Sequence, residues 1–325
     1  MAATTLAQAL NLGLRKALEG DRKVLVMGED VGRLGGVFRI TDGLHKDFGE
    51  DRVVDTPLAE SGIVGTAVGL AFRGYRPVCE IQFDGFAYPA FDQIVSQLAK
   101  IRTRTRGRVT MPVVVRIPYG GGIGAVEHHS ESPEAYFAHT AGLRVVSPAS
   151  PADAYWMIQQ SVACDDPVIF LEPKRRYWDR EEFEPGAGAP LALHAARVAR
   201  PGRDVTLVGY GPTVRVCLDA AAAAAQEGHS AEVIDLRSLS PLDTDTVARS
   251  VARTGRLVVV HEAPGFLGPG AELAASIGER CFYSLQAPTL RVTGYDTPYP
   301  PSRLENAYLP DLERVLDAVH HSLAY

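Results

Sequence analysis

Cysteine is scarce in this sequence. The chain has four cysteines, and none belongs to a CxxC pair or to another spacing that is typical of metal ligands. They lie far apart, at Cys79, Cys164, Cys217 and Cys281. Isolated cysteines are typical of reduced thiols, so we expect a cytoplasmic protein that is not built on disulfide bonds.

Long hydrophobic runs are also missing. No uncharged apolar stretch reaches the length of about 18 residues that a membrane-spanning helix needs. The first 21 residues lack the basic start and continuous apolar core of a signal peptide. Their apolar residues recur at helical spacing instead, at Leu6, Leu10, Leu14 and Leu18. We therefore expect an N-terminal amphipathic helix and no membrane association.

An excess of positive charge is absent as well. The formal net charge is −6 and the sequence pI is about 5.9, which disfavours a nucleic-acid partner. The run RTRTRGR carries Arg102, Arg104, Arg106 and Arg108. We interpret these arginines as cations near the end of a helix, where they are favoured by the helix dipole.

The composition is that of a globular protein, with 46% hydrophobic and 22% charged residues in 325. Short apolar runs, such as residues 24–30 and 111–118, alternate along the chain with helical patterns, such as residues 89–101 and the amphipathic stretch 312–319. This alternation predicts an α/β fold with mainly parallel sheets flanked by helices.

One segment differs from the rest. Residues 179–204 are first charged and then rich in Pro, Gly and Ala, which is typical of a connection between domains. We expect domains over residues 1–185 and 204–325, joined by a linker at 186–203.

Three glycine clusters, at residues 32–36, 120–124 and 265–270, raise the question of phosphate binding. None fits GxGxxG between a strand and a helix, and none fits GxxxxGK[ST]. We therefore interpret all three as turns, and a dinucleotide- or nucleotide-dependent enzyme is disfavoured.

An unusual helix is predicted to start at Thr56-Pro57, with Thr as cap and Pro at the first position. It contains Gly62, Gly65 and Gly69, each costing up to about 1 kcal/mol relative to Ala, which indicates that something packs close against it. Glu60 is either a first-turn glutamate that interacts with the helix dipole or a poorly solvated carboxylate that exchanges a proton.

A second candidate site is the segment EHHSESPE, which follows a glycine-rich loop. It contains His128 and His129, which either are solvated loop residues or include a catalytic group. Neighbours in an extended chain point to opposite sides, so we expect at most one of them in a given site. A zinc site is not expected, because no further ligands occur at usable spacing.

Taken together, several long segments resemble one family. They are GEDVGRLGGVFRIT, TPLAESGIVGTAVGLA, EIQFDGFAYPAFDQIVSQLAK, HSESPEAYF, DDPVIFLEPK, AEVIDLRSLSPLD, TGRLVVVHEAP and RVTGYDTPYP. The chain resembles, along essentially its whole length, the beta subunit of the thiamine-diphosphate-dependent decarboxylase component of 2-oxo acid dehydrogenase complexes. HEAP, CFYSLQAP and RVTGYDTPYP are more similar to the branched-chain (3-methyl-2-oxobutanoate) enzyme than to the pyruvate enzyme.

The resemblance implies a transketolase-like fold whose first domain binds the aminopyrimidine end of thiamine diphosphate. The matching positions are Glu60 at the ring nitrogen, Leu58 and Gln82 along the cofactor, and Phe86 stacked on the ring. Many relatives have Ala-Asp-Tyr at residues 84–86, so the tyrosine hydroxyl is missing here. His129 matches the active-site histidine that serves lipoyl transfer, and Glu131 stands where many relatives have Gln.

The resemblance also implies a structural potassium ion. The matching positions are Met111, Val113, Val114, Ser161, Cys164 and Asp166. Cys164 replaces an acidic residue of some relatives, where a backbone carbonyl could still bind.

Thiamine enzymes hold the diphosphate through magnesium with a Gly-Asp-Gly motif, which this sequence lacks. The resemblance therefore implies that an alpha subunit supplies magnesium ligation in an α2β2 heterotetramer. Further implied partners are the lipoyl acyltransferase component and a 2-oxo acid substrate. The alternatives are a pyruvate dehydrogenase beta subunit and a non-catalytic α/β binding or scaffold protein, and the presence of both Glu60 and His129 argues against the latter.

Overall fold

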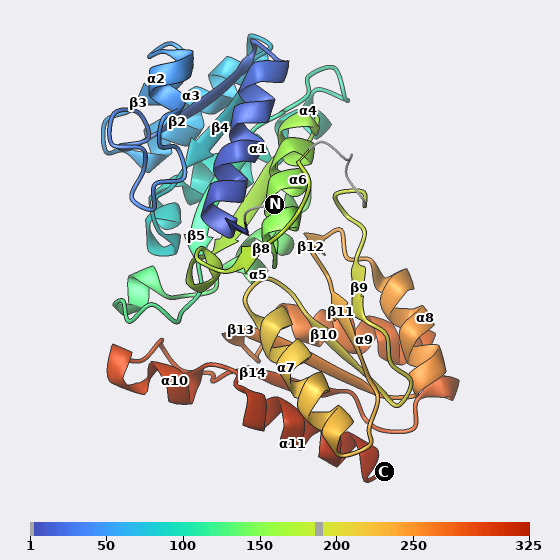
Figure 1. Ribbon diagram of the computed structural model, residues 1–325. Coiled ribbons are helices and arrows are strands. Elements are labelled where there is room, and N and C mark those ends of the chain that lie inside the picture. Colours follow the sequence, from blue (N-terminus) through green and yellow to red (C-terminus); the bar gives the residue numbers. More distant parts are fainter. Residues whose placement is uncertain (1–2, 186–190) are drawn as a thin grey trace. The chain divides into compact units, whose positions relative to one another are not determined.

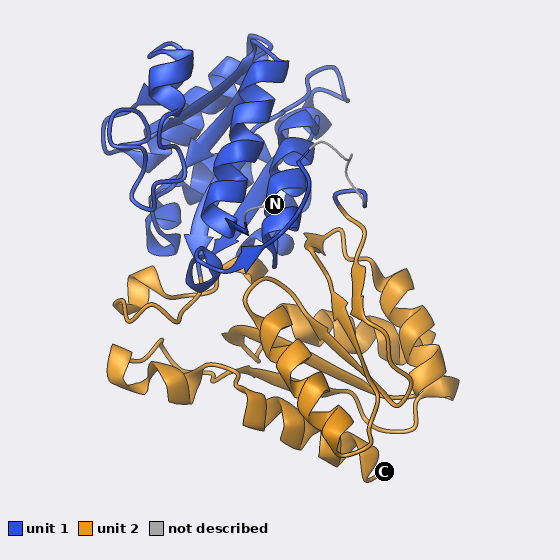
Figure 2. Cartoon of the chain, in the orientation of Figure 1, with its two compact units in different colours: residues 1–119, 136–193 blue, residues 120–135, 194–325 orange. Residues whose placement is uncertain are grey.

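The computed structural model describes residues 3–185 and 191–325. Residues 186–190, part of the expected linker, lie outside the described residues. The chain forms two compact units, unit 1 with residues 1–119 and 136–193, and unit 2 with residues 120–135 and 194–325 (Figure 2). The segment 120–135 thus belongs by its contacts to the second unit, although it lies within the first by sequence.

Unit 1 is built on a parallel sheet in which β6, β7, β5, β4, β2 and β3 lie side by side in that order. The strands of unit 1 are β1 (Thr4–Thr5), β2 (Val24–Gly28), β3 (Val53–Asp55), β4 (Arg76–Glu80), β5 (Val114–Tyr119), β6 (Arg144–Val146), β7 (Val168–Pro173) and β8 (Arg180–Glu181). Its helices are α1 (Leu6–Gly20), α2 (Leu44–Phe48), α3 (Glu60–Phe72), the 3-10 helix η1 (Asp84–Ala90), the π-helix η2 (Gln93–Leu98), α4 (Ile101–Arg104), α6 (Pro151–Ala163) and the 3-10 helix η4 (Lys174–Arg176). Helix α5 (Glu134–Ala138) crosses the boundary between the units.

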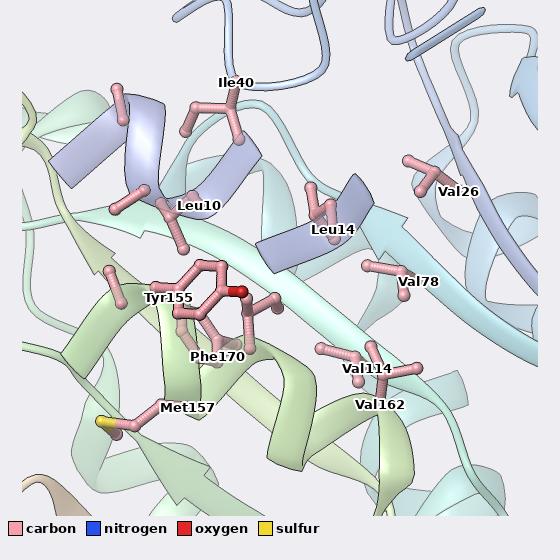
Figure 3. Close-up of a cluster of buried hydrophobic side chains, with 14 of the residues drawn as sticks. Leu10, Leu14, Val26, Ile40, Val78, Val114, Tyr155, Met157, Val162 and Phe170 are labelled. Carbon is pink, nitrogen blue, oxygen red and sulfur yellow. The ribbon is translucent and has the colours of Figure 1, made fainter. Parts of the chain in front are cut away.

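The core of unit 1 lies between the sheet and the pair α1 and α6 (Figure 1). The predicted stripe of α1 is buried, and Leu10 lies beside Tyr155 of α6 in Figure 3. Gly13 lies in this contact, because a Cβ there would approach Ile158 Cγ2 to 2.4 Å and the Tyr155 carbonyl to 2.8 Å. The small residue allows the two helices to approach closely.

Two helix predictions in unit 1 need correction. Helix α3 begins at Glu60 and not at Thr56-Pro57, because the Thr56 N–H still donates to Gly28 of β2 at 2.9 Å and continues the sheet. The helix expected over residues 89–101 is divided among η1, η2 and α4, with Pro89 inside η1.

Unit 2 has a second sheet in the order β14, β13, β10, β11 and β9, parallel except for the edge strand β9. Helices α7 and α11 pack together, as do α8 and α9 (Figure 1). Its strands are β9 (Arg197–Arg200), β10 (Val205–Gly209), β11 (Ala231–Asp235), β12 (Ser238–Ser240), β13 (Leu257–Pro264) and β14 (Leu290–Gly294). Its helices are η3 (Glu127–His129), α7 (Thr213–Gln226), α8 (Thr244–Thr254), α9 (Pro269–Arg280), η5 (Phe282–Ser284), η6 (Ser302–Leu304), α10 (Glu305–Tyr308) and α11 (Leu312–Leu323).

Both units therefore have the mainly parallel sheets with flanking helices that the sequence predicts. Strand β9 falls inside the expected linker and pairs with β11, so that part of the linker is an edge of the second sheet. Among the described residues, no helix is long and apolar enough to span a membrane.

Candidate active site

Three polar residues of the candidate site follow neighbouring strands of unit 1. Glu29 follows β2, Glu60 opens α3 after β3, and Gln82 follows β4. The three strands are adjacent and parallel, so their carboxyl ends share one edge of the sheet, where α/β proteins bind ligands. Gln82 Nε2 lies 3.5 Å from Asp30 Oδ2, which joins the ends of β2 and β4.

Glu60 is a buried acid at this edge. It is 8% exposed, and within the described part of the chain no group donates a hydrogen bond to its carboxylate. It lies in the first turn of α3, where the amino end of a helix attracts negative charge. A buried carboxylate with unused acceptor capacity is suited to receive an N–H from a ligand.

Glu29 is a second acid beside Glu60, and the sequence analysis did not single it out. Its Oε1 atom is buried, and none of the residues that the structure describes forms a hydrogen bond with it. Desolvation, followed by the negative charges of Glu60 and Asp30, raises the pKa of Glu29 above its usual value. The signal for Glu29 was available in the sequence, since it directly follows an apolar strand, but its nearness to Glu60 depends on the order of the strands.

Leu58 and Phe86 contribute apolar surface to unit 1. Leu58 is 79% exposed on the turn before α3. Phe86 is half-buried in η1, with its ring centroid 6.1 Å from that of Phe83 in an edge-to-face contact. The ion pair of Asp84 with Lys174, 2.7 Å long and buried, fixes the start of η1.

His128 and His129 belong to unit 2, in the 3-10 turn η3. The expectation that their rings point to opposite sides is wrong, because the segment is helical rather than extended, and the ring centroids are 4.3 Å apart. His128 is exposed and its Nδ1 lies 3.3 Å from Glu127 Oε1, whereas His129 is half-buried and its Nδ1 lies 2.9 Å from the His128 carbonyl. The two histidines therefore differ in burial and partners rather than in direction.

The residues predicted for potassium form a separate group in unit 1, near the amino ends of β5 and β7. They are Met111, Val113, Val114, Ser161, Cys164 and Asp166. Their two segments are adjacent, since the Met111 N–H donates to the Asp165 carbonyl at 3.1 Å.

Two polar side chains of this group, Asp166 and Ser161, already make contacts within unit 1. Arg144 and Arg102 hold the Asp166 carboxylate and keep its pKa below the usual range, although burial acts in the other direction. The Ser161 hydroxyl donates to the Met157 carbonyl, and Arg76 donates to the Cys164 carbonyl at 3.2 Å. Backbone carbonyls of these segments keep a second lone pair that could bind a cation. Among the described residues, no group of three or more His, Cys, Asp and Glu is placed to bind a metal ion.

The glycine clusters donate their amides to the protein itself. Gly32 donates to Asp55 Oδ1 at 2.6 Å, and Gly121 and Gly122 donate to Glu262 and Glu305. Phe266 donates to Asp296. These contacts agree with their interpretation as turns rather than phosphate sites.

Comparisons with known proteins cover nearly the whole chain. The family model for the transketolase pyrimidine-binding domain matches residues 2–178, and that for the transketolase C-terminal domain matches residues 194–315. A pyruvate dehydrogenase E1 component subunit beta of Leifsonia xyli subsp. xyli is 62% identical, over 98% of this chain and 95% of that protein. A 3-methyl-2-oxobutanoate dehydrogenase subunit beta of Mycobacterium tuberculosis is 59% identical, over 98% and 92%.

The fold is shared with a solved structure. A split-gene transketolase in an inactive beta4 tetramer superposes with a TM-score of 0.81 over 99% of both chains, at 22% identity. The predicted transketolase-like, two-domain fold is thereby confirmed. With family models and close relatives in agreement along its length, the chain belongs to the transketolase-like E1 beta subunits of the 2-oxo acid dehydrogenases.

Proposed function

We propose that this chain acts with an alpha subunit and thiamine diphosphate in the oxidative decarboxylation of branched-chain 2-oxo acids, followed by reductive acylation of a lipoyl group. The observation that carries the proposal is the similarity to E1 beta subunits over 98% of the chain. The buried Glu60 carboxylate, which lacks a donor among the described residues, is the local feature that fits it.

The residues near the carboxyl ends of β2, β3 and β4 fit an aminopyrimidine ring. Such a ring has a polar edge and two apolar faces. Glu60 would accept a hydrogen bond from the ring nitrogen and hold a proton there, and the poorly hydrated surroundings strengthen this contact. Leu58 and Phe86 would contact the faces, and Gln82 the polar edge. When bound, thiamine diphosphate supplies the nucleophilic carbon that attacks the 2-oxo group.

The alpha subunit would supply magnesium and diphosphate ligation, since the sequence has no Gly-Asp-Gly motif. The glycine face of α3 supports an assembly with other chains. Gly62, Gly65 and Gly69 are exposed, and a Cβ at Gly69 would meet no atom of residues 3–185 and 191–325 within 4 Å. We propose an α2β2 heterotetramer in which another chain covers this face. In this proposal, a potassium ion would be bound by backbone carbonyl oxygens near Met111 and Cys164.

His129 would donate a proton to a sulfur of the lipoyl dithiolane carried by the acyltransferase component. His129 Nδ1 lies 2.9 Å from the His128 carbonyl, to which an Nδ1–H would donate. In that tautomer, Nε2 is the nitrogen that exchanges a proton with the substrate. The carbonyl contact orients the ring for this role.

The substrate has two candidates, because the relatives carry different names. Pyruvate is supported by the relative at 62% identity. Branched-chain acids are supported by the relative at 59% and by the segments HEAP, CFYSLQAP and RVTGYDTPYP. We place the branched-chain acid first on the strength of these segments.

The test is steady-state kinetics of the enzyme reconstituted with its alpha subunit. We expect kcat/KM for 3-methyl-2-oxobutanoate to exceed that for pyruvate by roughly tenfold or more, because a pocket gains about that much from added methyl groups. The chain without its partner is the control and should show no turnover. A preference for pyruvate would move the assignment to the second candidate, and no turnover of either acid would favour the non-catalytic alternative.

A further inference from the structure

The loop that precedes His129 is held by unit 2. Residues 120–124 follow β5 of unit 1, yet their contacts assign them to unit 2 (Figure 2). Three residues after Gly124, the turn η3 begins and carries both histidines. The groups that fix residues 120–124 therefore determine where η3 starts.

A single carboxylate of unit 2 binds two amides of this loop. Glu305, at the start of α10, accepts from the Gly122 N–H through Oε1 at 2.8 Å and from the Gly124 N–H through Oε2 at 3.0 Å. The Tyr299 hydroxyl donates to Oε1 at 2.7 Å. Glu305 is 6% exposed, so these bonds replace the water that the carboxylate lost on burial.

The backbone of the loop is shaped to this arrangement. Gly120, Gly122 and Gly124 have positive φ angles of 81°, 91° and 72°, so that amides can converge on an anion. Gly121 donates to Glu262 Oε2 at 3.1 Å, and a Cβ at Gly121 would approach the Tyr299 hydroxyl to 1.9 Å. The amides of this glycine cluster thus bind carboxylates of the chain itself.

We propose that Glu305 is a positioning residue for the reaction: it holds the loop 120–124 so that η3 presents His129 for lipoyl transfer. The inference rests on the proposed role of His129. Both carboxylate oxygens are needed, since each serves one amide. A glutamine has one acceptor oxygen and would direct its NH2 group at the other N–H, so Glu305→Gln releases one side of the loop with almost no change in volume.

The first measurement is amide hydrogen exchange of the full chain over the peptide that contains Gly122 and Gly124. We expect exchange in Glu305→Gln to be roughly tenfold faster or more, with little change in the strands of the unit 2 sheet. Glu279→Gln, at an exposed glutamate of α9, is the matched control and should leave exchange unchanged. Tyr299→Phe removes only the hydroxyl that donates to Glu305 and should increase the exchange rate less than Glu305→Gln does. This second variant tests the same arrangement if Glu305→Gln folds poorly.

The second measurement separates the two half-reactions in the reconstituted enzyme. We expect Glu305→Gln to lower acylation of a lipoylated domain by about 10–100-fold, as a misplaced catalytic group does, while decarboxylation with an artificial electron acceptor changes less than about threefold. His129→Ala should show the same selective loss, and Glu279→Gln none.

The outcomes are distinguishable. Unchanged exchange in Glu305→Gln overturns the anchoring role. Faster exchange with normal acylation, in an enzyme in which His129→Ala impairs acylation, overturns the positioning role. If His129→Ala leaves acylation unchanged while hydrogen exchange in Glu305→Gln is faster, the proposed role of His129 is wrong, but Glu305 still holds the loop 120–124. Faster exchange together with selective loss of acylation supports the whole inference.

Discussion

At the scale of single residues, chemistry and burial combine at Glu60. Its residue type and its position before a glycine-rich helix were visible in the sequence. Its 8% exposure, the nearby Glu29, and the lack of a donor within the described residues come from the structure. These observations favour a ligand-binding carboxylate over a first-turn glutamate that only interacts with the helix dipole.

Glu60→Gln should lower decarboxylation by about 10²–10³-fold, because the neutral amide cannot act as the charged acceptor at the ring nitrogen. The measurement is turnover of the reconstituted enzyme with an artificial electron acceptor. Glu50→Gln, at an exposed glutamate of the same unit, is the control and should keep full activity. Near-normal turnover by Glu60→Gln at unchanged Tm would return Glu60 to the dipole interpretation.

His261 is a second informative residue, and its role is structural. It is completely buried in β13, its Nδ1 lies 3.0 Å from the Ala263 carbonyl, and its Nε2 accepts from the Gly270 N–H at 3.2 Å. The neutral ring therefore caps the first turn of α9. Desolvation lowers the pKa of His261 to about 4, so the native state resists protonation.

Because the folded pKa lies below the value of about 6.5 in the unfolded chain, the unfolded state binds more protons between these limits. The stabilising effect of neutral His261 is complete above pH 6.5 and is lost as the pH falls toward 4. Between pH 7 and pH 4, the free energy of unfolding of the wild type should fall by up to about 3 kcal/mol more than that of His261→Gln. Denaturant unfolding of unit 2 at several pH values measures this difference, with exposed His321→Gln as the control. A difference that does not depend on pH would contradict the assignment.

At the scale of elements, packing overrides local propensity. Gly13 lies within α1, where helix propensity alone favours Ala by about 1 kcal/mol. The contact with α6 reverses this preference, because a Cβ would approach backbone and side-chain atoms of α6 to less than 3 Å. Gly278 of α9 offers the opposite case, since a Cβ there would meet no atom of the described part of the chain within 4 Å.

Gly13→Ala should therefore destabilise the chain by about 1–3 kcal/mol, as overpacking of a core contact does. Gly278→Ala should instead stabilise it by up to about 1 kcal/mol through helix propensity. Both values are obtained from urea unfolding curves that are followed by far-UV circular dichroism. Equal effects of the two substitutions would show that propensity, and not the α1–α6 contact, decides the outcome.

At the scale of the whole molecule, the exposed glycine face of α3 is the feature that the chain by itself does not explain. The sequence indicates close packing against Gly62, Gly65 and Gly69, and nothing in the described chain supplies it at Gly69. In the proposed heterotetramer, another subunit covers this face.

Gly69→Leu should leave the stability of the isolated chain within about 1 kcal/mol of the wild type, since the position is exposed and a Cβ there would meet no atom of the described residues within 4 Å. The same change should reduce assembly with the alpha subunit, because a large residue prevents a close approach of helices. Analytical ultracentrifugation of the mixed subunits measures this effect. Gly20→Leu, at the exposed end of α1, is the control. Normal assembly of Gly69→Leu would exclude this face from the interface.

The sequence by itself determined the α/β class, most strands, the amphipathic helices α1 and α11, and the glycine turns, because these depend on periodicity and backbone preference within a few residues. It also identified the family through long motifs, and hence Glu60 and His129 as candidates. Local patterns failed where tertiary contacts decide the structure. The start of α3 was predicted too early, because the hydrogen bond from Thr56 to Gly28 continues the sheet, and the segment of η3 was predicted to be extended although it is helical.

Only the tertiary structure placed Glu29 beside Glu60, made Gly13 a contact with α6, and joined Gly122 to Glu305, 183 positions away in the chain. Each of these depends on the order of strands or on the path of a loop, which brings together residues that have no pattern in common. A carboxylate such as Glu305 looks like an ordinary surface residue in the sequence, since its burial and its two amide partners are properties of the folded unit alone.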